Sequence, residues 1–496
     1  MTTHRSPDPS LLDDLALQAR LRPDEPALTW REGVVSHGQL ARMSDRLEKE
    51  LATGGRPLVA VPAVKAPQTI ALVLACMKAA RPVLLLSTEL GSATREALLA
   101  RVGGPGLATV TADLRVEWSG GATPGDAPAG PDIPPNTLLL LTTSGSTGIP
   151  KIVPLGRSAV DRFTDWARAE FGLGPGTRVL NYAPLNFDLC LLDIWATLRA
   201  GGHCVLVDQE RAADPRYLLD LFTATEPEVV QSVPLFYRLL SEAAGAAGVA
   251  FPGVRHVLLT GDHTPRPLRA GLPALFPSAV FHNVYGCTET NDSFLHSLGP
   301  AELAAAEVLP LGRPLPGVTA AVLDEDGVLD GPGTGELLVS TPFQTTGYLA
   351  EDGPGDRFTG PPDGLPPGTY YRTGDLVTRA PDGALTLVGR TDFQVKVRGV
   401  RVSIEEVERV LLAHEGVVHA AVVGLPDEAA GTRLVAVVLR RSPRLSVFTL
   451  RRHCADRLPK AAVPASFRFT EHALPLTSTG KTDRRRVKDL LREERI

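Results

Sequence analysis

Short apolar runs alternate with longer amphipathic stretches through the middle of the chain. The apolar runs are typical of buried strands, and we expect strands at 137–141, 178–182, 203–207, 228–233, 254–260 and 279–284. The stretches between them are typical of helices that bury one face, and we expect helices at 157–171, 188–199, 215–224, 235–244 and 265–275. Repeated strand–helix–strand units predict an α/β protein with a largely parallel sheet and helices on both faces.

The pattern changes near residue 389. Short predicted strands at 385–388 and 394–397 are followed by a predicted helix at 404–413 and by further predicted strands at 420–423 and 434–439. This order is typical of a small α+β unit. We therefore expect a large N-terminal α/β region that is joined near 390–392 to a small C-terminal α+β domain.

Composition narrows the classes of function. The 496 residues are 43% apolar and carry a net charge of −5, which argues against a nucleic-acid partner. The longest apolar run, 69–77, is too short to cross a membrane, and the N-terminus lacks the apolar core of a signal peptide. Five scattered cysteines without paired spacing indicate free thiols in a reducing compartment. We expect a cytoplasmic protein with neither a membrane nor a nucleic-acid partner.

A loop rich in hydroxyls and glycine follows the predicted strand at 137–141. Residues 144–151 have the sequence Ser-Gly-Ser-Thr-Gly-Ile-Pro-Lys. The glycines let backbone N–H groups turn inward, the hydroxyls add donors and Lys151 adds positive charge, which favours phosphate binding over a solvated turn. Because Pro150 precedes the lysine and Ile152 follows it, the loop does not match the Walker A pattern.

Two further segments carry side chains suited to a nucleotide. In 283–289, Tyr285 offers a flat face for a base, and Thr288 and Glu289 offer oxygen ligands suited to Mg²⁺. In 371–375, an aspartate on a tight turn can accept two ribose hydroxyls. A core tyrosine at a strand end and an aspartate that closes a turn are the alternatives, and neither segment decides between them alone.

Taken together, these motifs resemble the adenylate-forming superfamily, which includes acyl-CoA synthetases, luciferases and the adenylation domains of nonribosomal peptide synthetases. The resemblance spans nearly the whole chain and includes four more motifs, Gly335-Glu-Leu, Gly389-Arg-Thr-Asp392, Gln394-Val-Lys-Val-Arg-Gly399 and Pro475-Leu-Thr-Ser-Thr-Gly-Lys481. This resemblance, and not the periodicity, identifies the reaction. It implies that the protein uses ATP and Mg²⁺ to activate a carboxylate as acyl-AMP, with release of pyrophosphate.

The resemblance also assigns roles to the matching residues. The loop 142–151 should bind the β- and γ-phosphates, and the segment 283–286 should bind the adenine. Thr288 and Glu289 should bind the α-phosphate and the metal. Asp375, helped by Arg390, should bind the ribose. The residues assigned to ATP are Thr142, Thr143, Ser144, Gly145, Ser146, Thr147, Gly148, Lys151, Asn283, Tyr285, Gly286, Thr288, Asp375 and Arg390, and the residue assigned to magnesium is Glu289.

The resemblance implies a two-part enzyme with a mobile small domain. We expect an adenylation core over 1–389, a hinge at 390–392 with Asp392 at its centre, and a small mobile domain over 393–496. Lys481 in that domain should be the catalytic residue of the first step. Its ammonium can reach the substrate carboxylate and the phosphate oxygens and offset their charge as the carboxylate attacks the α-phosphorus.

The segment 186–195 resembles the amino-acid-binding segment of peptide-synthetase adenylation domains. Its acidic residue, Asp188, would pair with the substrate α-ammonium, which is costly to bury alone. A role as a helix N-cap is the alternative. The positions that align with the substrate pocket are Asp188, Leu189, Leu192, Ser232, Leu259, Gly261, Val284 and Asp292.

The first pocket positions are apolar, so we expect a small or medium neutral amino acid. The opening Asp-Leu…Leu resembles prolyl-carrier-protein ligases, which favours L-proline. Asp292 would suit a second donor on the substrate if it faces the pocket.

We expect the acceptor to be a separate protein. The chain ends 15 residues after Lys481 without a Gly-Gly-x-Ser site, so the product should pass to the phosphopantetheine thiol of a stand-alone carrier protein. Such transfer belongs to nonribosomal peptide or antibiotic biosynthesis. The alternatives are transfer to coenzyme A, a D-alanine, β-amino-acid or acyl-CoA ligase, and a non-catalytic nucleotide-binding relative.

Overall fold

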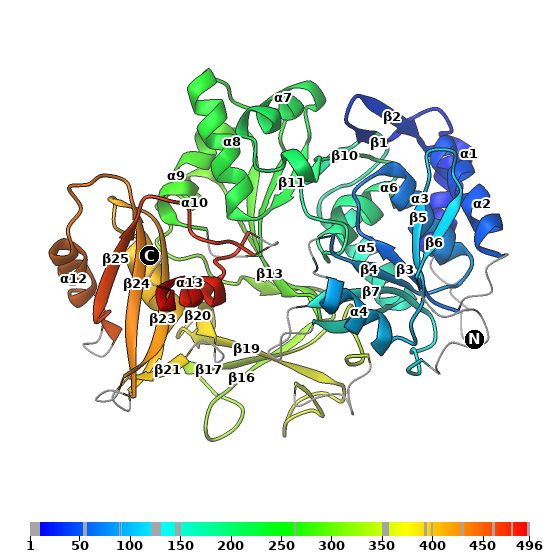
Figure 1. Ribbon diagram of the computed structural model, residues 1–496. Coiled ribbons are helices and arrows are strands. Elements are labelled where there is room, and N and C mark those ends of the chain that lie inside the picture. The colour runs from blue at the N-terminus through cyan, green and yellow to red at the C-terminus, as the bar shows by residue number, and fades with distance from the viewer. Residues whose placement is uncertain are drawn as a thin grey trace.

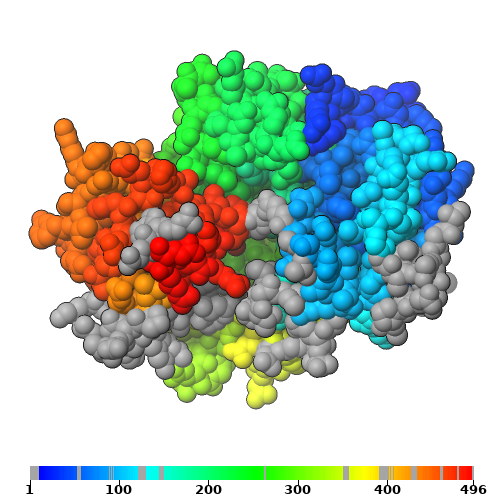
Figure 2. Space-filling view, viewed as in Figure 1, coloured from blue at the N-terminus to red at the C-terminus, as the bar shows by residue number. Residues whose placement is uncertain are grey.

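A computed structural model describes most of the chain. The described residues are 10–52, 57–88, 90, 92–120, 130–143, 150–261, 264–349, 357–390, 394–397, 400–427, 431–458, 462–477 and 480–493. Figure 1 shows the chain passing from N-terminal helices and strands (blue and cyan), through a central part (green), to a C-terminal part (orange and red) on the opposite side. In Figure 2 the C-terminal residues form the left of the face and the N-terminal residues the right.

A nine-stranded sheet forms the centre of the N-terminal region. Its strand order is β15-β14-β13-β12-β11-β9-β10-β1-β2, and β13 through β1 run parallel, with β14, β15 and β2 antiparallel at the two edges. The strands are β1 (Pro26–Trp30), β2 (Gly33–Ser36), β9 (Arg178–Asn181), β10 (His203–Leu206), β11 (Val229–Ser232), β12 (His256–Leu259), β13 (Val280–Cys287), β14 (Asn291–Leu298) and β15 (Arg313–Pro314). The parallel core matches the expected α/β fold class.

Helices cover both faces of this sheet because successive strand residues point to opposite sides. Val179 belongs to an apolar cluster with the helix α5 (Arg157–Glu170), whereas Leu180 belongs to a second cluster with α7 (Pro215–Thr225). The second cluster also holds the helices α8 (Pro234–Ala247) and α9 (Arg266–Leu275). These helices begin and end within three residues of the predicted ones.

A six-stranded sheet lies beside it, in the order β6-β5-β3-β4-β7-β8. Its strands are β3 (Val59–Pro62), β4 (Val83–Leu86), β5 (Leu107–Val110), β6 (Val116–Ser119), β7 (Thr137–Thr143) and β8 (Lys151–Gly156). The strand β8 between the loop 144–151 and the predicted helix was not expected. The apolar run 152–155 is buried as the antiparallel strand β8, so the loop joins the two strands of a hairpin.

The remaining helices of the N-terminal region lie around the two sheets. They are α1 (Leu11–Leu21), α2 (His37–Ala52), α3 (Pro67–Lys78), α4 (Ser92–Arg101), α6 (Thr197–Arg199), α10 (Pro300–Ala305) and the 3₁₀ helix η2 (Gln209–Arg211). The helix α3 is apolar all round and buried at 69–77, as a core helix should be. One apolar cluster joins α3 to residues of both sheets.

A smaller antiparallel sheet and the C-terminal part complete the fold. The sheet contains β16 (Thr319–Leu323), β17 (Gly333–Ser340), β18 (Phe358–Thr359), β19 (Tyr370–Arg379) and β20 (Leu385–Arg390). The C-terminal part contains β21 (Gln394–Val397), β22 (Val400–Ser403), α11 (Ile404–Leu412), β23 (Val417–Asp427), β24 (Gly431–Arg440), α12 (Val447–Ala455), β25 (Ser466–Thr470) and α13 (Arg484–Arg492). Its core is a separate apolar cluster of α11, α12 and the strands β23 and β24, in agreement with the expected α+β unit. The expected hinge residue Asp392 lies outside the described residues.

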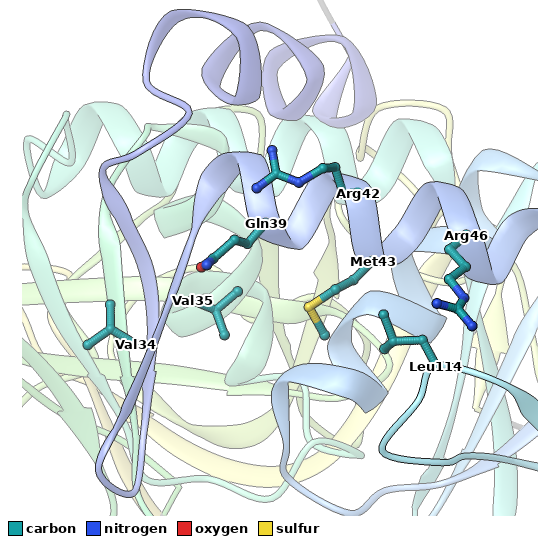
Figure 3. A pocket seen from close by; sticks show the side chains of 7 residues that line it. All are labelled: Val34, Val35, Gln39, Arg42, Met43, Arg46 and Leu114. Carbon is teal, nitrogen blue, oxygen red and sulfur yellow. The ribbon is translucent and has the colours of Figure 1, made fainter.

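Two further features concern the surface. Within the ranges given above, none of the helices has the length and apolar character needed to cross a membrane. A shallow groove of about 480 Å³ lies over β2 and α2 and is lined by Val34, Val35, Gln39, Arg42, Met43, Arg46 and Leu114 (Figure 3). No residue assigned to ATP or to the substrate lines this groove.

Candidate active site

The segment 283–289 ends β13 with a bulge at Tyr285 and Gly286. A Cβ atom on Gly286 would come within 2.3 Å of the Asn291 carbonyl oxygen and 2.7 Å of the Asp292 Cα. Only glycine fits this close approach of two backbones. The bulge therefore sets the direction in which the turn after Gly286 leaves the sheet.

Tyr285 contacts the predicted ribose-binding residue. Its hydroxyl donates a hydrogen bond to Asp375 Oδ2, across 90 residues of sequence. Asp375 is buried on β19 and lies directly opposite Arg390 on β20. The structure thus brings together three residues from three motifs. The side chain of Arg390 lies outside the described residues.

Tyr348 contacts both the predicted metal ligand Glu289 and Lys151 at the end of the phosphate loop. The hydroxyl of Tyr348 donates to Glu289 Oε1 at 2.8 Å, and the Lys151 ammonium lies 4.1 Å from the centroid of the Tyr348 ring. The Tyr348 hydroxyl also lies 3.2 Å from that of Tyr371. Burial and the nearby Glu289 raise the pKa of both tyrosines, so both hydroxyls stay protonated.

Tyr348 was missed in the sequence analysis. Its only local signal is its place after Gly347, a glycine with positive φ in a turn. Its contact with Glu289 joins residues 59 positions apart, and no short-range pattern reports such a contact.

The phosphate loop is described only at its two ends. Thr143 pairs with Lys151, and Thr142 pairs with Ile152, so the loop begins and ends on the β7–β8 hairpin. The other residues assigned to phosphates, Ser144, Gly145, Ser146, Thr147 and Gly148, lie outside the described residues.

Asn283 is engaged with the backbone. Its Nδ2 donates to the Pro310 carbonyl at 2.9 Å. The side-chain oxygen of Asn283 is thus the group that remains for a nucleotide base.

Asp188 lies on a turn after β9 and is linked to the nucleotide motif. The Leu189 N–H donates to its Oδ1 at 3.1 Å, and the Thr288 hydroxyl acts on its carboxylate. Burial raises the pKa of Asp188, the charge of Glu289 raises it further, and the Thr288 hydroxyl opposes the rise. A substrate ammonium placed here would stabilise the ionised carboxylate.

The helix expected at 188–199 is present from Cys190 to Arg199, but most of it is a π-helix. The structure has a π-helix, η1 (Leu191–Ala196), followed by the short α6. The Thr197 hydroxyl donates to the Leu192 carbonyl, five residues back. The residue that caps η1 is Cys190, which makes no side-chain cap bond, so the N-cap alternative for Asp188 is not supported.

Among the other residues assigned to the substrate, Ser232 and Leu259 end β11 and β12, where ligands bind in such sheets. Leu192 and Val284 are buried in one cluster, against which Leu189 packs. Leu259 instead belongs to the cluster on the opposite face, and its neighbour Leu258 lies on the side of Leu192. The structure therefore separates Leu259 from the other apolar positions.

Two polar positions complete this set. Asp292 lies on β14 opposite Gly286, and burial together with the charge of Asp188 raises its pKa to about 8. Ser232 is 1% exposed, and its hydroxyl has no hydrogen-bond partner among the described residues. Gly261 has a φ of +79°, a conformation that favours glycine.

The loop of Lys481 lies against the nine-stranded sheet. A Cβ atom on Gly480 would lie 3.5 Å from Leu235 Cδ2 and 3.8 Å from Val233 Cγ2, at the start of α8. The Lys481 side chain is exposed, and its backbone closes a turn with Thr477. In Figure 1 this red segment reaches the green part of the molecule. Gly480, the residue before Lys481, thus lies beside the segment that follows the carboxyl end of β11.

The side chains near Glu289 fit one magnesium ion that is bound together with phosphates. Mg²⁺ is usually held by one or two carboxylates, phosphate oxygens and water, and Glu289 supplies one carboxylate. Over the described ranges, no three His, Cys, Asp or Glu side chains gather in a way that could hold a metal without help. A nucleotide would therefore have to supply the remaining ligands.

Two family models match nearly the same part of the chain as the motifs do. The family model described as AMP-binding enzyme matches residues 15–349. The model described as AMP-binding enzyme C-terminal domain matches residues 406–481.

Curated relatives include ligases and large synthetases. The chain is 35% identical over 362 residues to the L-proline–[L-prolyl-carrier protein] ligase of Streptomyces coelicolor, covering 72% of this chain and 67% of the relative. It is 27% identical over 501 residues to the D-alanine–D-alanyl carrier protein ligase of Bacillus velezensis, covering 96% and 98%. It is 30% identical over 485 residues to tyrocidine synthase 3 of Brevibacillus parabrevis, covering 93% of this chain but only 7% of that synthase.

Solved structures show the same fold. The o-succinylbenzoate CoA synthetase (MenE) of Bacillus subtilis, in complex with the acyl-adenylate intermediate OSB-AMP, superposes with a TM-score of 0.80 at 23% identity, covering 96% of this chain and 98% of that chain. The same enzyme in complex with ATP and a magnesium ion gives a TM-score of 0.80, covering 96% and 99%. The predicted fold class is thereby confirmed.

Proposed function

The chain belongs to the family of AMP-binding enzymes, and we propose that it activates an amino acid with ATP as aminoacyl-AMP and transfers it to a carrier protein. The observation that carries this proposal is the contact of the Thr288 hydroxyl with Asp188. Thr288 belongs to the nucleotide motif and Asp188 to the amino-acid segment. A substrate whose ammonium pairs with Asp188 therefore has its carboxylate close to the nucleotide.

The residues around Tyr285 would bind the nucleoside. Asp375 can accept hydroxyls of the ribose, and the tyrosine that donates to it limits how the carboxylate turns. Lys151 and the hairpin loop would hold the β- and γ-phosphates. A magnesium ion bound by Glu289 and the phosphates would supply positive charge that offsets the phosphate charge.

In the first half-reaction, a carboxylate oxygen of the amino acid attacks the α-phosphorus. The bond from the α-phosphorus to the bridging oxygen breaks, and pyrophosphate leaves. Two anions must approach each other, and Lys481 would offset the charge that builds up between them. Asp188 would hold the ammonium, which fixes the attacking carboxylate in place.

In the second half-reaction, the phosphopantetheine thiol loses its proton to solvent and its sulfur attacks the carbonyl of aminoacyl-AMP. The thioester forms and AMP leaves. We propose that the C-terminal domain, from residue 393, turns about a hinge at 390–392 between the two steps. Transfer to a separate carrier protein is part of this proposal, as is a cytosolic location, which fits the free state of all five cysteines.

The substrate is proposed to be a small neutral amino acid, with L-proline as the first candidate. The apolar side chains of Leu189, Leu192 and Val284 around Asp188 support a neutral side chain, and so does a relative named as a prolyl-carrier-protein ligase. Asp292 is compatible with it because a pKa of about 8 keeps this carboxyl mostly protonated at neutral pH. D-Alanine is the second candidate, favoured by a relative of nearly equal length.

ATP–pyrophosphate exchange tests the proposal. The panel should hold L-proline, L-serine, L-alanine, D-alanine and β-alanine, with a fatty acid and an aryl acid as controls. We expect exchange with one or two amino acids and none with the controls. Exchange with the fatty or aryl acid alone would contradict the role of Asp188, and no exchange with any acid would favour a non-catalytic relative.

A second measurement tests the acceptor. The enzyme, ATP and the preferred amino acid are incubated with a phosphopantetheinylated carrier protein or with coenzyme A, and the thioester is detected by mass. We expect loading of the carrier protein at micromolar concentration. Loading of coenzyme A alone would make the protein an acyl-CoA ligase.

A further inference from the structure

Four buried polar side chains lie beneath the turn that carries Asp188. Lys65, Asn181, Asp193 and Gln231 are each between 0% and 2% exposed, and we call them the buried polar cluster. Lys65 follows β3 of the six-stranded sheet, Asn181 and Gln231 lie on β9 and β11 of the nine-stranded sheet, and Asp193 lies in η1. Buried polar groups of this kind are unfavourable unless they are paired.

Two amides hold the carboxylate of Asp193. Asn181 and Gln231 are paired across the parallel strands β9 and β11. Asn181 Nδ2 donates to Asp193 Oδ2 at 3.0 Å, and Gln231 Nε2 donates to Asp193 Oδ1 at 3.1 Å. Both oxygens of the carboxylate are therefore anchored to neighbouring strands, which fixes the first turn of η1.

Gln231 also contacts the substrate segment directly. Its Nε2 donates to the Leu189 carbonyl at 3.1 Å, in addition to its bond to Asp193. Leu189 is the residue after Asp188, and its N–H donates to the Asp188 carboxylate. One amide side chain thus ties the peptide next to Asp188 to the sheet.

Lys65 joins this arrangement from the other sheet. Its ammonium donates to the carbonyls of Asn181 at 3.1 Å and Tyr182 at 2.9 Å. Burial lowers the pKa of Lys65 to about 8, and the charge of Asp193 opposes this fall. Burial raises the pKa of Asp193, and Lys65 opposes this rise. Lys65 and Asp193 thus act on each other in a place that solvent does not reach.

Asp193 places the cluster at the π-helix η1, which comes before the short α6. π-Turns are rare and are frequent at functional sites, and here the turn leads directly out of the segment 188–190. We propose that Lys65, Asn181, Asp193 and Gln231 are positioning residues that hold Asp188 and Leu189 at the amino-acid site, and that Lys65 makes this site depend on the contact between the two sheets. This inference rests on the proposed function.

Steady-state exchange kinetics test the inference, with the KM for the amino acid and for ATP measured separately. Gln231→Met removes the amide and leaves no unpaired charge. We expect it to raise the amino-acid KM at least threefold and to leave the ATP KM within twofold. Lys65→Met should raise the amino-acid KM at least tenfold. The matched control is Lys78→Met on α3, whose ammonium bonds Ser44 and Asp45, and it should change neither KM.

A double variant separates positioning from general damage. Asp193→Asn alone should raise the amino-acid KM at least tenfold. Lys65→Met combined with Asp193→Asn should raise it by less than the product of the two single effects, because both buried charges are then removed. The inference would be overturned if the amino-acid KM of the double variant rose by the product of the two single increases. Equal increases in the amino-acid KM and the ATP KM would also overturn it.

Folding of each variant is checked by its thermal unfolding curve. If Lys65→Met does not fold, Gln231→Met decides alone, and an unchanged amino-acid KM in this folded variant refutes the inference. Failure of the proposed function looks different, since the wild-type protein would then show no exchange with any amino acid.

Discussion

The hydroxyl of Thr288 acts on the carboxylate of Asp188 and lowers its pKa. These residues lie 100 positions apart and belong to two motifs, one assigned to the nucleotide and one to the amino acid. Thr288 is followed by Glu289, whose charge also acts on Asp188. The proposed ammonium site and the proposed metal site are therefore neighbours, as the attack of a carboxylate on the α-phosphorus requires.

Removal of the carboxylate of Asp188 should abolish amino-acid activation. In Asp188→Ala we expect kcat/KM for the amino acid to fall by about 100-fold or more, equivalent to about 3 kcal/mol, because the substrate ammonium would be desolvated without a partner. ATP binding, measured by equilibrium dialysis, should change by less than threefold. A variant with nearly normal exchange would show that the ammonium binds elsewhere.

Loss of the Thr288 hydroxyl should shift the pH dependence of kcat/KM for the amino acid to higher pH. The Thr288 hydroxyl lowers the pKa of Asp188, so Thr288→Val should raise that pKa. Because substrate binding needs the ionised carboxylate, the acidic limb of kcat/KM against pH should shift to higher pH. Thr288→Ser, which keeps the hydroxyl, is the matched control and should retain the wild-type limb. An identical limb in all three proteins would contradict this effect of Thr288.

Replacement of Asp292 should stabilise the protein at high pH. The folded pKa of about 8 lies above the ordinary aspartate value of 3.8, so the folded state keeps a proton that the unfolded state releases. Stability is then lost as pH rises from about 4 to about 8. Asp292→Asn removes this loss, and we expect its free energy of unfolding to exceed that of wild type at pH 9.

Urea unfolding at pH 5, 7 and 9 measures the effect of Asp292→Asn. The gain over wild type should be small at pH 5 and should grow towards pH 9. A gain that is the same at every pH would show that Asp292 is ionised in the folded protein across this range.

Tyr348 should act on the metal site. Tyr348→Phe keeps the ring near Lys151 and removes the donor to Glu289. We expect the Mg²⁺ concentration for half-maximal exchange to rise about threefold to tenfold, since a hydrogen bond to a charged group contributes about 1.5 kcal/mol. The KM of the amino acid should not change. An unchanged Mg²⁺ dependence would exclude an effect of Tyr348 on the metal.

Lys481 should be needed for the first half-reaction. Lys481→Ala should lower the exchange rate by about 100-fold or more, because a preorganised charge at the transition state is lost. Lys488→Ala on α13, seven residues along the same part of the chain, is the control and should keep wild-type exchange. Normal exchange by Lys481→Ala would overturn the catalytic assignment.

Sequence patterns were reliable where the physical cause is local. The alternation of residues in β9 sends Val179 and Leu180 to opposite faces, and apolar runs predicted the parallel strands β9 to β13 but not β1. Patterns also missed β8, where a short apolar run after a loop forms a strand, and the π-helical geometry of η1. The assignment of Leu259 shows how a difference of one residue changes the face of a strand.

The sequence by itself determined the family, the α/β order of elements and the motifs assigned to the nucleotide, because these depend on residue type and on spacing along the chain. Only the tertiary structure decided that Thr288 reaches Asp188, that Tyr348 joins Glu289 to Lys151, and that Lys65 crosses between two sheets. Each of these contacts joins residues that folding brings together from distant parts of the chain. Their energy comes from burial and pairing, which no local pattern records.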